Sequence, residues 1–307
     1  MSVAVLAGGV GGARFVRALT EAVDPPELTV VGNVGDDVEV LGLHVSPDLD
    51  TLLYTLARVG DDERGWGRRN ETWHALETVA ELGGDPWFKL GDRDLGLHLV
   101  RTNAGRPLSE ITQRFAEALE VDVTLLPATD DRLRTWVETP AGAFAFQDWF
   151  VRRGHRDRAD AVRFEGEEAA RPAPGVLEAI ESASLLAIAP SNPFVSIAPI
   201  LAVREIRAAF ENRRVPAVAV SPLIGGRAVK GPADAMFASL AGGTDPVDVA
   251  RCYVGLIDAL VIDEADAAGA AAVEELGVRP VVTSTLMPEA NAQLAEAVLS
   301  LVAAPAS

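Results

Sequence analysis

Six short apolar runs, each followed by a loop and a helical pattern, constrain the fold of this chain more than any other feature. The runs are residues 3–6, 28–31, 184–189, 215–220, 257–262 and 279–283. Continuous apolar strands are typical of a parallel sheet covered on both faces, and their alternation with helices favours a doubly wound arrangement. We therefore expect an α/β fold with a three-layer, Rossmann-like, mostly parallel sheet. Ligands of such sheets bind beyond the carboxyl ends of the strands.

The stretch from residue 61 to residue 175 differs from the rest of the chain. It holds all five tryptophans, and its helical patterns at 71–82 (after Asn70, a plausible N-cap) and 107–119 precede an alternating segment at 134–151 that is typical of a hairpin. We expect residues 1–60 and 176–307 to form a nucleotide-binding core. Residues 61–175 would then form an inserted α+β subdomain that roofs the site.

Charge and composition exclude several classes of function. The formal charge is −18, from 27 basic against 45 acidic residues, which excludes nucleic-acid binding through a broad basic face. The chain has no apolar run of roughly 18 residues, so we expect no membrane span. Cys252 is the single cysteine, which fits a reducing cytoplasm. We expect a cytoplasmic protein that gathers local positive charge wherever it binds an anion.

The first apolar run ends in a glycine-rich turn. Gly8, Gly9, Gly11 and Gly12 precede a helical pattern, and Arg14 stands near its start. The missing Cβ atoms let a ligand approach the backbone, and free N–H groups at a helix N-terminus favour an anion. We therefore expect a phosphate or diphosphate at this turn. A turn required only for tight packing between strand and helix is the alternative interpretation.

Two pairs of aspartates follow the second apolar run. Asp36 and Asp37 come first, and Asp48 and Asp50 come before a helix whose N-cap we place at Asp50 or Thr51. Carboxylate oxygens beside phosphates are the usual ligands of Mg²⁺, and a free carboxylate can act as a base toward a hydroxyl. We expect Asp36, Asp37 and Asp50 to hold the metal, with Asp48 as a weaker candidate. Capping alone is the alternative for Asp50 or Thr51.

The only two lysines, Lys89 and Lys230, lie in loops that resemble binding motifs. Lys89 follows Trp87 and Phe88, and aromatic side chains beside a cation can stack on a flat ring while the cation meets a phosphate. An ordinary buried aromatic with surface charges is the alternative. Further loops at strand ends carry Ser191 and Asn192, then Gly225 and Gly226 ahead of Lys230, and they are additional candidates for binding an anion or a base.

Taken in order, these motifs resemble the 2-phospho-L-lactate transferases of coenzyme F420 biosynthesis and their bacterial phosphoenolpyruvate transferase counterparts. The matching elements are residues 6–15, 33–37, 47–51, 90–94, 126–131, 189–193 and 230–232. The resemblance runs from residue 1 to at least residue 240, and the first element is closer to the bacterial branch. Lys89 departs from the acid that some bacterial members carry.

The resemblance implies a specific reaction. The acceptor is the deazaflavin alcohol Fo, and the donor is lactyl- or enolpyruvyl-diphosphoguanosine. The terminal ribityl hydroxyl of Fo attacks the outer phosphorus, GMP leaves, and F420-0 or dehydro-F420-0 forms. The family also implies Mg²⁺ and a homodimer.

The resemblance and the motif positions together assign roles to residues. Asp50, Asp36 and Lys89 are the expected catalytic residues, and Asp50 and Lys89 also contact Fo. The remaining substrate-binding residues are Gly8, Gly9, Gly11, Gly12, Arg14, Asn33, Thr51, Asp92, Ser191, Asn192, Gly225, Gly226 and Lys230. Among these, the glycine turn takes the diphosphate, and Ser191, Asn192 and the Gly225–Gly226 loop take guanosine.

Two other classes of function remain as alternatives. A non-enzymatic regulator that binds nucleotide sugars on the same fold shares the glycine turn but usually carries Pro-Pro-Gly-Asp where this chain has residues 46–51. A nicotinamide oxidoreductase is disfavoured because Arg14 replaces the third glycine of the dinucleotide fingerprint. The second strand also ends on Gly32 and Asn33 instead of an acid that holds a ribose.

Overall fold

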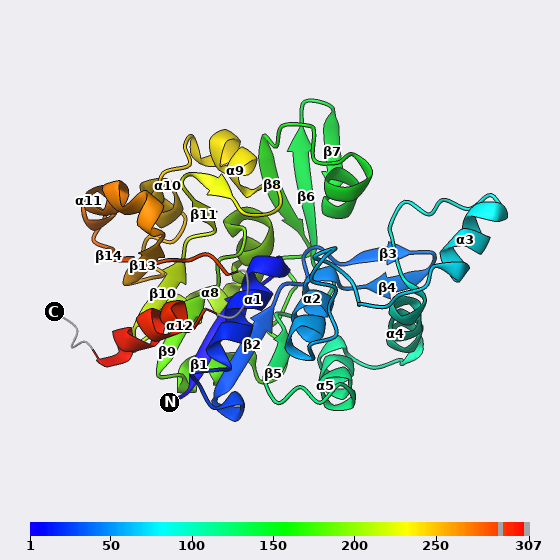
Figure 1. Cartoon of the computed structure of the whole chain (residues 1–307), viewed down its shortest axis with the longest axis horizontal. Helices are drawn as coiled ribbons and strands as arrows, with labels where there is room; N and C mark the ends of the chain where they lie inside the picture. The colour runs from blue at the N-terminus through cyan, green and yellow to red at the C-terminus, as the bar shows by residue number, and fades with distance from the viewer. Residues whose placement is uncertain (288–290, 304–307) are drawn as a thin grey trace.

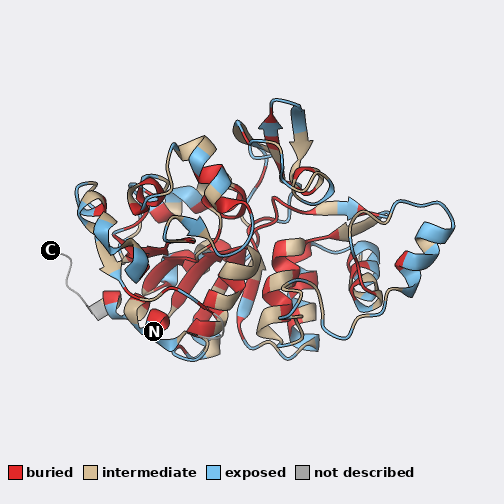
Figure 2. Ribbon diagram, turned by 45° about the horizontal axis from the view of Figure 1, so that its top comes forward, coloured by how far each residue is buried: buried red, intermediate tan, exposed pale blue. Residues whose placement is uncertain are grey.

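A computed structural model describes residues 1–287 and 291–303 and confirms the α/β fold. Seven parallel strands form the central sheet in the order β14-β13-β10-β9-β1-β2-β5 (Figure 1). Their bounds are β1 (Val3–Ala7), β2 (Leu28–Gly32), β5 (Thr124–Pro127), β9 (Leu185–Ile188), β10 (Ala217–Val220), β13 (Ala259–Ile262) and β14 (Arg279–Val282). The five inner strands are almost wholly buried, as their apolar runs predict (Figure 2).

The direction of winding reverses between β1 and β9. From β1 the chain moves to β2 and then β5 on one side, and it later returns to β9 on the other side of β1. Val5 accordingly pairs with Val30 of β2 and with Ala187 of β9. Ligands of doubly wound sheets bind at this switch point, beyond the carboxyl ends of the strands. The loops after β1 and β9 therefore mark the place to search for the site.

Strand β5 lies within the segment that the sequence predicts to be an insertion, yet it pairs with β2 in the central sheet. The predicted boundary at residues 61–175 is wrong in this respect. The strand was missed because it has only two adjacent leucines, Leu125 and Leu126, between Thr124 and Pro127, too short an apolar run to stand out. The rest of the division between core and roof stays a prediction.

Helices cover both faces of the sheet. On one face α1 (Gly9–Leu19) packs against α2 (Pro47–Leu56) and α12 (Ala292–Leu299), in front of the strands in Figure 1. A second group, α6 (Val176–Ser182), α7 (Ala198–Ala202) and α8 (Arg204–Glu211), packs together. The remaining helices are α3 (His74–Glu81), α4 (Asp92–Asn103), α5 (Leu108–Ala118), α9 (Ala233–Met236), α10 (Pro246–Arg251) and α11 (Ala270–Glu274). Within the described residues, no helix has the length and apolar character needed to cross a membrane.

Two small β units project from the sheet in Figure 1. The hairpin β3 (Val38–Val40) and β4 (Leu43–Val45) points toward α3 and α4. A separate antiparallel sheet, β7-β6-β8, consists of β6 (Arg134–Thr139), β7 (Gly142–Ala145) and β8 (Ala161–Glu165) and contains the predicted hairpin. A short ribbon of β11 (Leu223–Ile224) and β12 (Arg227–Ala228) completes the strands.

Several predicted helix starts are wrong by a few residues. Helix α3 begins at His74 after Trp73, and Asn70, the predicted N-cap, has a left-handed backbone (φ 57°) outside the helix. Helix α2 begins at Pro47 after Ser46, so Asp50 and Thr51 lie inside its first turns instead of capping it. Proline is favoured at the first helical position, which explains the earlier start.

Candidate active site

The glycine turn and the loop after β9 meet at the switch point. The backbone N–H of Gly8 donates to Ser191 Oγ (3.1 Å), and that hydroxyl donates back to the Gly8 carbonyl (2.7 Å). Helix α1 starts at Gly9, earlier than predicted, and Gly9 has a left-handed backbone (φ 68°) that suits glycine. Its N–H donates to Asp48 Oδ1 (2.8 Å). Two N–H groups that the sequence assigns to a ligand are thus bonded to protein side chains.

Close packing accounts for the other glycines of the turn. A Cβ on Gly11 would lie 2.7 Å from the carbonyl oxygen of Pro190, and one on Gly12 would lie 2.5 Å from Ser191 Oγ. A Cβ on Gly8 would collide with the Asp48 carboxylate. These glycines let α1 approach the loop after β9, which supports the packing interpretation for them.

Asp48 and Asp36 form a buried carboxylate pair next to the first turn of α1. Asn33 bridges them, because its Nδ2 donates to Asp48 Oδ2 (2.9 Å) and to Asp36 Oδ1 (3.4 Å). Gln147 Nε2 donates to Asp36 Oδ2 (3.2 Å). Burial, followed by the charges of Asp48 and Asp37, raises the pKa of Asp36 well above its usual value. Burial likewise raises the pKa of Asp48 to about 6.

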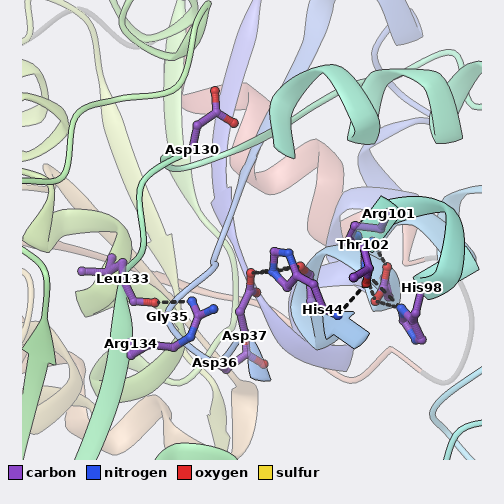
Figure 3. Close-up of polar contacts among 12 residues, drawn as sticks. Gly35, Asp36, Asp37, His44, His98, Arg101, Thr102, Asp130, Leu133 and Arg134 are labelled. Atoms are coloured by element: carbon purple, nitrogen blue, oxygen red, sulfur yellow. Dashed lines mark hydrogen bonds and ion pairs between the residues drawn. The ribbon is translucent and has the colours of Figure 1, made fainter. Parts of the chain in front are cut away.

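Asp37 has one oxygen that is bonded and one that is not. Its Oδ2 interacts with His44 Nε2 (2.7 Å) and accepts a hydrogen bond from Ser46 Oγ (3.0 Å), as Figure 3 shows for the His44 contact. Its Oδ1 is buried and has no hydrogen-bond partner among the described residues. A buried carboxylate oxygen without a partner is costly, and a bound cation would compensate for that cost.

Asp50 is held by Arg101, an arginine outside the predicted site residues. Arg101 on α4 donates from Nη1 to Asp50 Oδ2 (3.0 Å) and from Nη2 to Asp50 Oδ1 (2.5 Å). His98 Nδ1 lies 3.9 Å from the same carboxylate. Burial raises the pKa of Asp50, but the charge and hydrogen bonds of Arg101 outweigh it and leave that pKa below its usual value. Burial lowers the pKa of His98 to about 4.

The contact between α2 and α4 continues along both helices. Tyr54, one turn after Asp50, donates its hydroxyl to Asp94 Oδ1 (2.6 Å), and burial raises the pKa of Asp94 to about 6. Asp94, His98 and Arg101 are all buried. Their spacing of four and three residues places them on one face of α4, and that spacing of polar residues is the sequence signal that could have found them.

Asp36, Asp37 and Asp48 together form what we call the aspartate cluster. Lys89 and Asp92 make no hydrogen bond or ion pair with these three residues. Lys89 is exposed and lines a cavity of about 450 Å³ together with Trp66 and Trp73. Asp92 accepts hydrogen bonds from Thr72 Oγ1 and from the backbone N–H groups of the first residues of α3, which gives it a structural partner in place of a free carboxylate.

The loops predicted to hold guanosine make internal contacts. Asn192 Oδ1 accepts from the Phe194 N–H (2.9 Å), and the Gly225 N–H donates to Asp266 Oδ2 (2.9 Å). Gly226, at the tip of the same ribbon, has a left-handed backbone (φ 70°). Lys230 Nζ donates to the Gly65 carbonyl (2.6 Å), which joins the ribbon to the loop before α3.

The carboxylates present fit a magnesium ion that takes most of its ligands from a substrate. Among the residues that the structure describes, no three His, Cys, Asp or Glu side chains converge as a metal-binding group. Mg²⁺ commonly uses one or two carboxylates, with phosphate oxygens and water completing its octahedron. Asp37, with its unbonded Oδ1, and the neighbouring Asp36 fit that role. Asp50 fits it less well, since both of its oxygens bind Arg101.

Known proteins are similar to this chain over nearly its whole length. A phosphoenolpyruvate transferase of Streptomyces griseus is 43% identical over 306 residues, covering 97% of this chain and 96% of the relative. One from Kitasatospora aureofaciens is 44% identical over 313 residues, covering 98% of each. The crystal structure of protein BH3568 from Bacillus halodurans shares the fold with a TM-score of 0.66 at 18% identity, over 97% of this chain and 99% of that one.

The family model described as "2-phospho-L-lactate transferase CofD" matches residues 3–297, nearly the whole chain. The glycine turn, the aspartate cluster and the loop after β9 all lie within this range. The chain therefore belongs to the CofD family, whose members are transferases of coenzyme F420 biosynthesis.

Proposed function

We propose that this protein transfers a phosphoenolpyruvyl or phospholactyl group from a guanosine diphosphate-activated donor to the terminal ribityl hydroxyl of Fo, with release of GMP. The observation that carries the proposal is the crowding of Asp36, Asp37 and Asp48 beside the first turn of α1. Buried carboxylates at the switch point of the sheet are suited to a metal-bound diphosphate. The names of the relatives favour the enolpyruvyl donor.

Positioning and charge neutralisation are the main requirements of this chemistry. Mg²⁺ held by Asp37 together with the donor would neutralise the diphosphate. Asp36 is the proposed base for the hydroxyl of Fo, because its carboxylate is part of the same buried group. Asp50 is proposed to contact Fo while Arg101 keeps its carboxylate ionised.

The cavity formed by α3 and the loops before and after it is the proposed place for the deazaflavin ring. Trp66 and Trp73 face each other edge to face with their ring centroids 6.2 Å apart, and Lys89 lines the same cavity. Aromatic faces beside a cation suit a flat heterocycle. The loops after β9 and β10 are the proposed guanosine site, with Ser191 and Asn192 in the first loop and Gly225 and Gly226 in the second.

We further propose a cytoplasmic homodimer. Leu99 and Val100 on α4 and Leu82 after α3 are exposed on the arm that projects from the sheet. A second copy of the chain that covers them would remove this apolar surface from water. Light scattering on the purified protein tests the dimer.

The reaction is tested by mixing the protein with Fo and Mg²⁺ and adding either donor. We expect deazaflavin fluorescence to report Fo binding, and chromatography to show GMP and dehydro-F420-0 or F420-0 in equal amounts. Asp36→Asn should bind Fo but turn over at least 100-fold more slowly. Nucleotide binding without GMP release would instead indicate the regulatory alternative, and failure to bind Fo would refute the proposal.

A further inference from the structure

A second cavity lies along α1 and α2, beside the aspartate cluster. Its volume is about 410 Å³, and Val10 and Arg17 of α1 line it together with Thr51 of α2 and Arg58 and Arg69 of the following loop. Val10 lies within the glycine turn, between Gly9 and Gly11, and Thr51 follows Asp50. Arg17 lies seven positions after Val10 along α1, so the cavity extends roughly 10 Å along the helix from the glycine turn.

Four arginines line this cavity, and Arg14 alone among them has a side-chain hydrogen bond in the part of the chain that the structure describes, to the Met287 carbonyl (3.2 Å). Within the described residues, Arg17, Arg58 and Arg69 form no ion pair and no side-chain hydrogen bond, and Arg17 Nε is buried without a partner. The protein carries 45 acidic residues against 27 basic ones, so three neighbouring arginines without carboxylate partners are unexpected. Of the two acids in the lining, Asp61 is engaged by Arg64 (2.7 Å) and Asp62 is exposed.

The loop that carries two of these arginines is fixed in place. Arg58 has a left-handed backbone (φ 56°), which is uncommon for residues other than glycine. The Arg69 N–H donates to the Val59 carbonyl (2.9 Å), which holds the two ends of the loop together. Arg58 and Arg69 are therefore held on one closed loop, and both line the cavity.

We propose that this cavity is a carboxylate subsite that binds the acid end of the three-carbon group carried by the donor. The inference rests on the proposed function, in which the outer phosphate carries a lactyl or enolpyruvyl carboxylate. The planar guanidinium fork matches a carboxylate with two parallel hydrogen bonds. With the diphosphate beside the aspartates at the first turn of α1, the acid end would point toward Arg17, Arg58 and Arg69 and would remain there in the product.

Two probes test the subsite by isothermal titration calorimetry on the full chain. The first is malonate, which carries carboxylates only. The second is a pair of guanosine diphosphate esters with either a carboxymethyl or a methyl group on the outer phosphate. We expect the wild-type protein to bind malonate and to prefer the carboxymethyl ester. Arg17→Gln and Arg58→Gln should each weaken malonate binding by roughly tenfold or more, since a hydrogen bond to a charged group is lost. Each variant should also bind the carboxymethyl and methyl esters with similar affinity.

Two further variants make the test specific. Arg17→Lys keeps the charge without the fork and should lose only part of the affinity. Arg207→Gln, which removes an exposed arginine of α8 paired with Glu211, should change neither probe. Circular dichroism confirms that each variant is folded.

The outcomes separate the two claims. Malonate binding that depends on the arginines, without binding of either guanosine ester, would support the subsite and refute the proposed donor. If the variants lose the same affinity for both esters, or if no probe binds in a way that depends on the arginines, the subsite is overturned. The proposed reaction still stands in that case if GMP is released.

Discussion

Arg101 on α4 donates hydrogen bonds to both carboxylate oxygens of Asp50 on α2, and both side chains are buried. The pair joins the arm of the molecule that contains α3 and α4 to α2, the helix that also carries Asp48. It therefore fixes the carboxylate that we propose to meet Fo, and it does so with a residue far away in the sequence.

Arg101→Met should destabilise the protein by roughly 3–5 kcal/mol, because it leaves the Asp50 charge buried without a partner. The measurement is the free energy of unfolding from urea titrations at pH 7. The double variant Asp50→Asn/Arg101→Met is the control and should recover most of that stability, since it removes both charges, while it remains inactive. A single variant that loses less than about 1 kcal/mol would contradict the buried pair.

Asp94 should make the protein less stable as the pH rises from 4 to 7. Burial raises the pKa of Asp94 from 3.8 to about 6, so between these values the folded state binds more protons than the unfolded state. Asp94→Asn cannot titrate, yet it can still accept the hydrogen bond from Tyr54. As the pH rises across this range, the unfolding free energy of the wild type should therefore decrease by up to about 3 kcal/mol relative to that of Asp94→Asn. A difference that does not vary with pH would show that Asp94 titrates normally.

His98 should act in the opposite direction. Burial lowers the pKa of His98 from 6.5 to about 4, so the folded state binds fewer protons between these values and stability rises with pH. His98→Asn removes this rise. Between pH 4 and 6.5 the unfolding free energy of the wild type should therefore increase by up to about 3 kcal/mol relative to that of His98→Asn. Titration of the His98 ring by NMR measures the same shift directly, and a midpoint near 6.5 would refute it.

Two helical glycines should respond differently to alanine. In Gly11→Ala the new Cβ meets the Pro190 carbonyl oxygen at 2.7 Å, so α1 must move away from the loop after β9. We expect loss of stability by about 1–3 kcal/mol together with weaker nucleotide binding. Gly96→Ala on α4 meets nothing within 4 Å and should gain up to about 1 kcal/mol from helix propensity. Thermal unfolding and nucleotide titration compare the two variants, and equal effects would mean that the packing at Gly11 is not tight.

Much of the fold could be predicted from local patterns. Each apolar run reports a strand buried on both faces, which is a property of that segment alone, so six of the seven strands of the central sheet were found. The resemblance carried by the motif series also identified the family, and the family model confirms it. The apolar pattern does not predict strand β5, because an edge strand needs fewer apolar residues than an inner one.

The partners of the polar groups could not be predicted in the same way. The sequence places Asp36, Asp37, Asp48 and Asp50 near one another, but it treats Asp50 as one of a set of metal ligands. Tertiary packing divides that set, because α4 brings Arg101 to Asp50 while Asn33 joins Asp48 to Asp36. Helix and strand patterns depend on neighbouring residues and burial, whereas the charge state and partners of a carboxylate depend on which distant side chains the fold places within a few ångströms of it. Local sequence patterns are therefore sufficient to predict the sheet and the family. Which carboxylate is neutralised by an arginine, and which has an oxygen left for a ligand, depends on how the helices and loops pack.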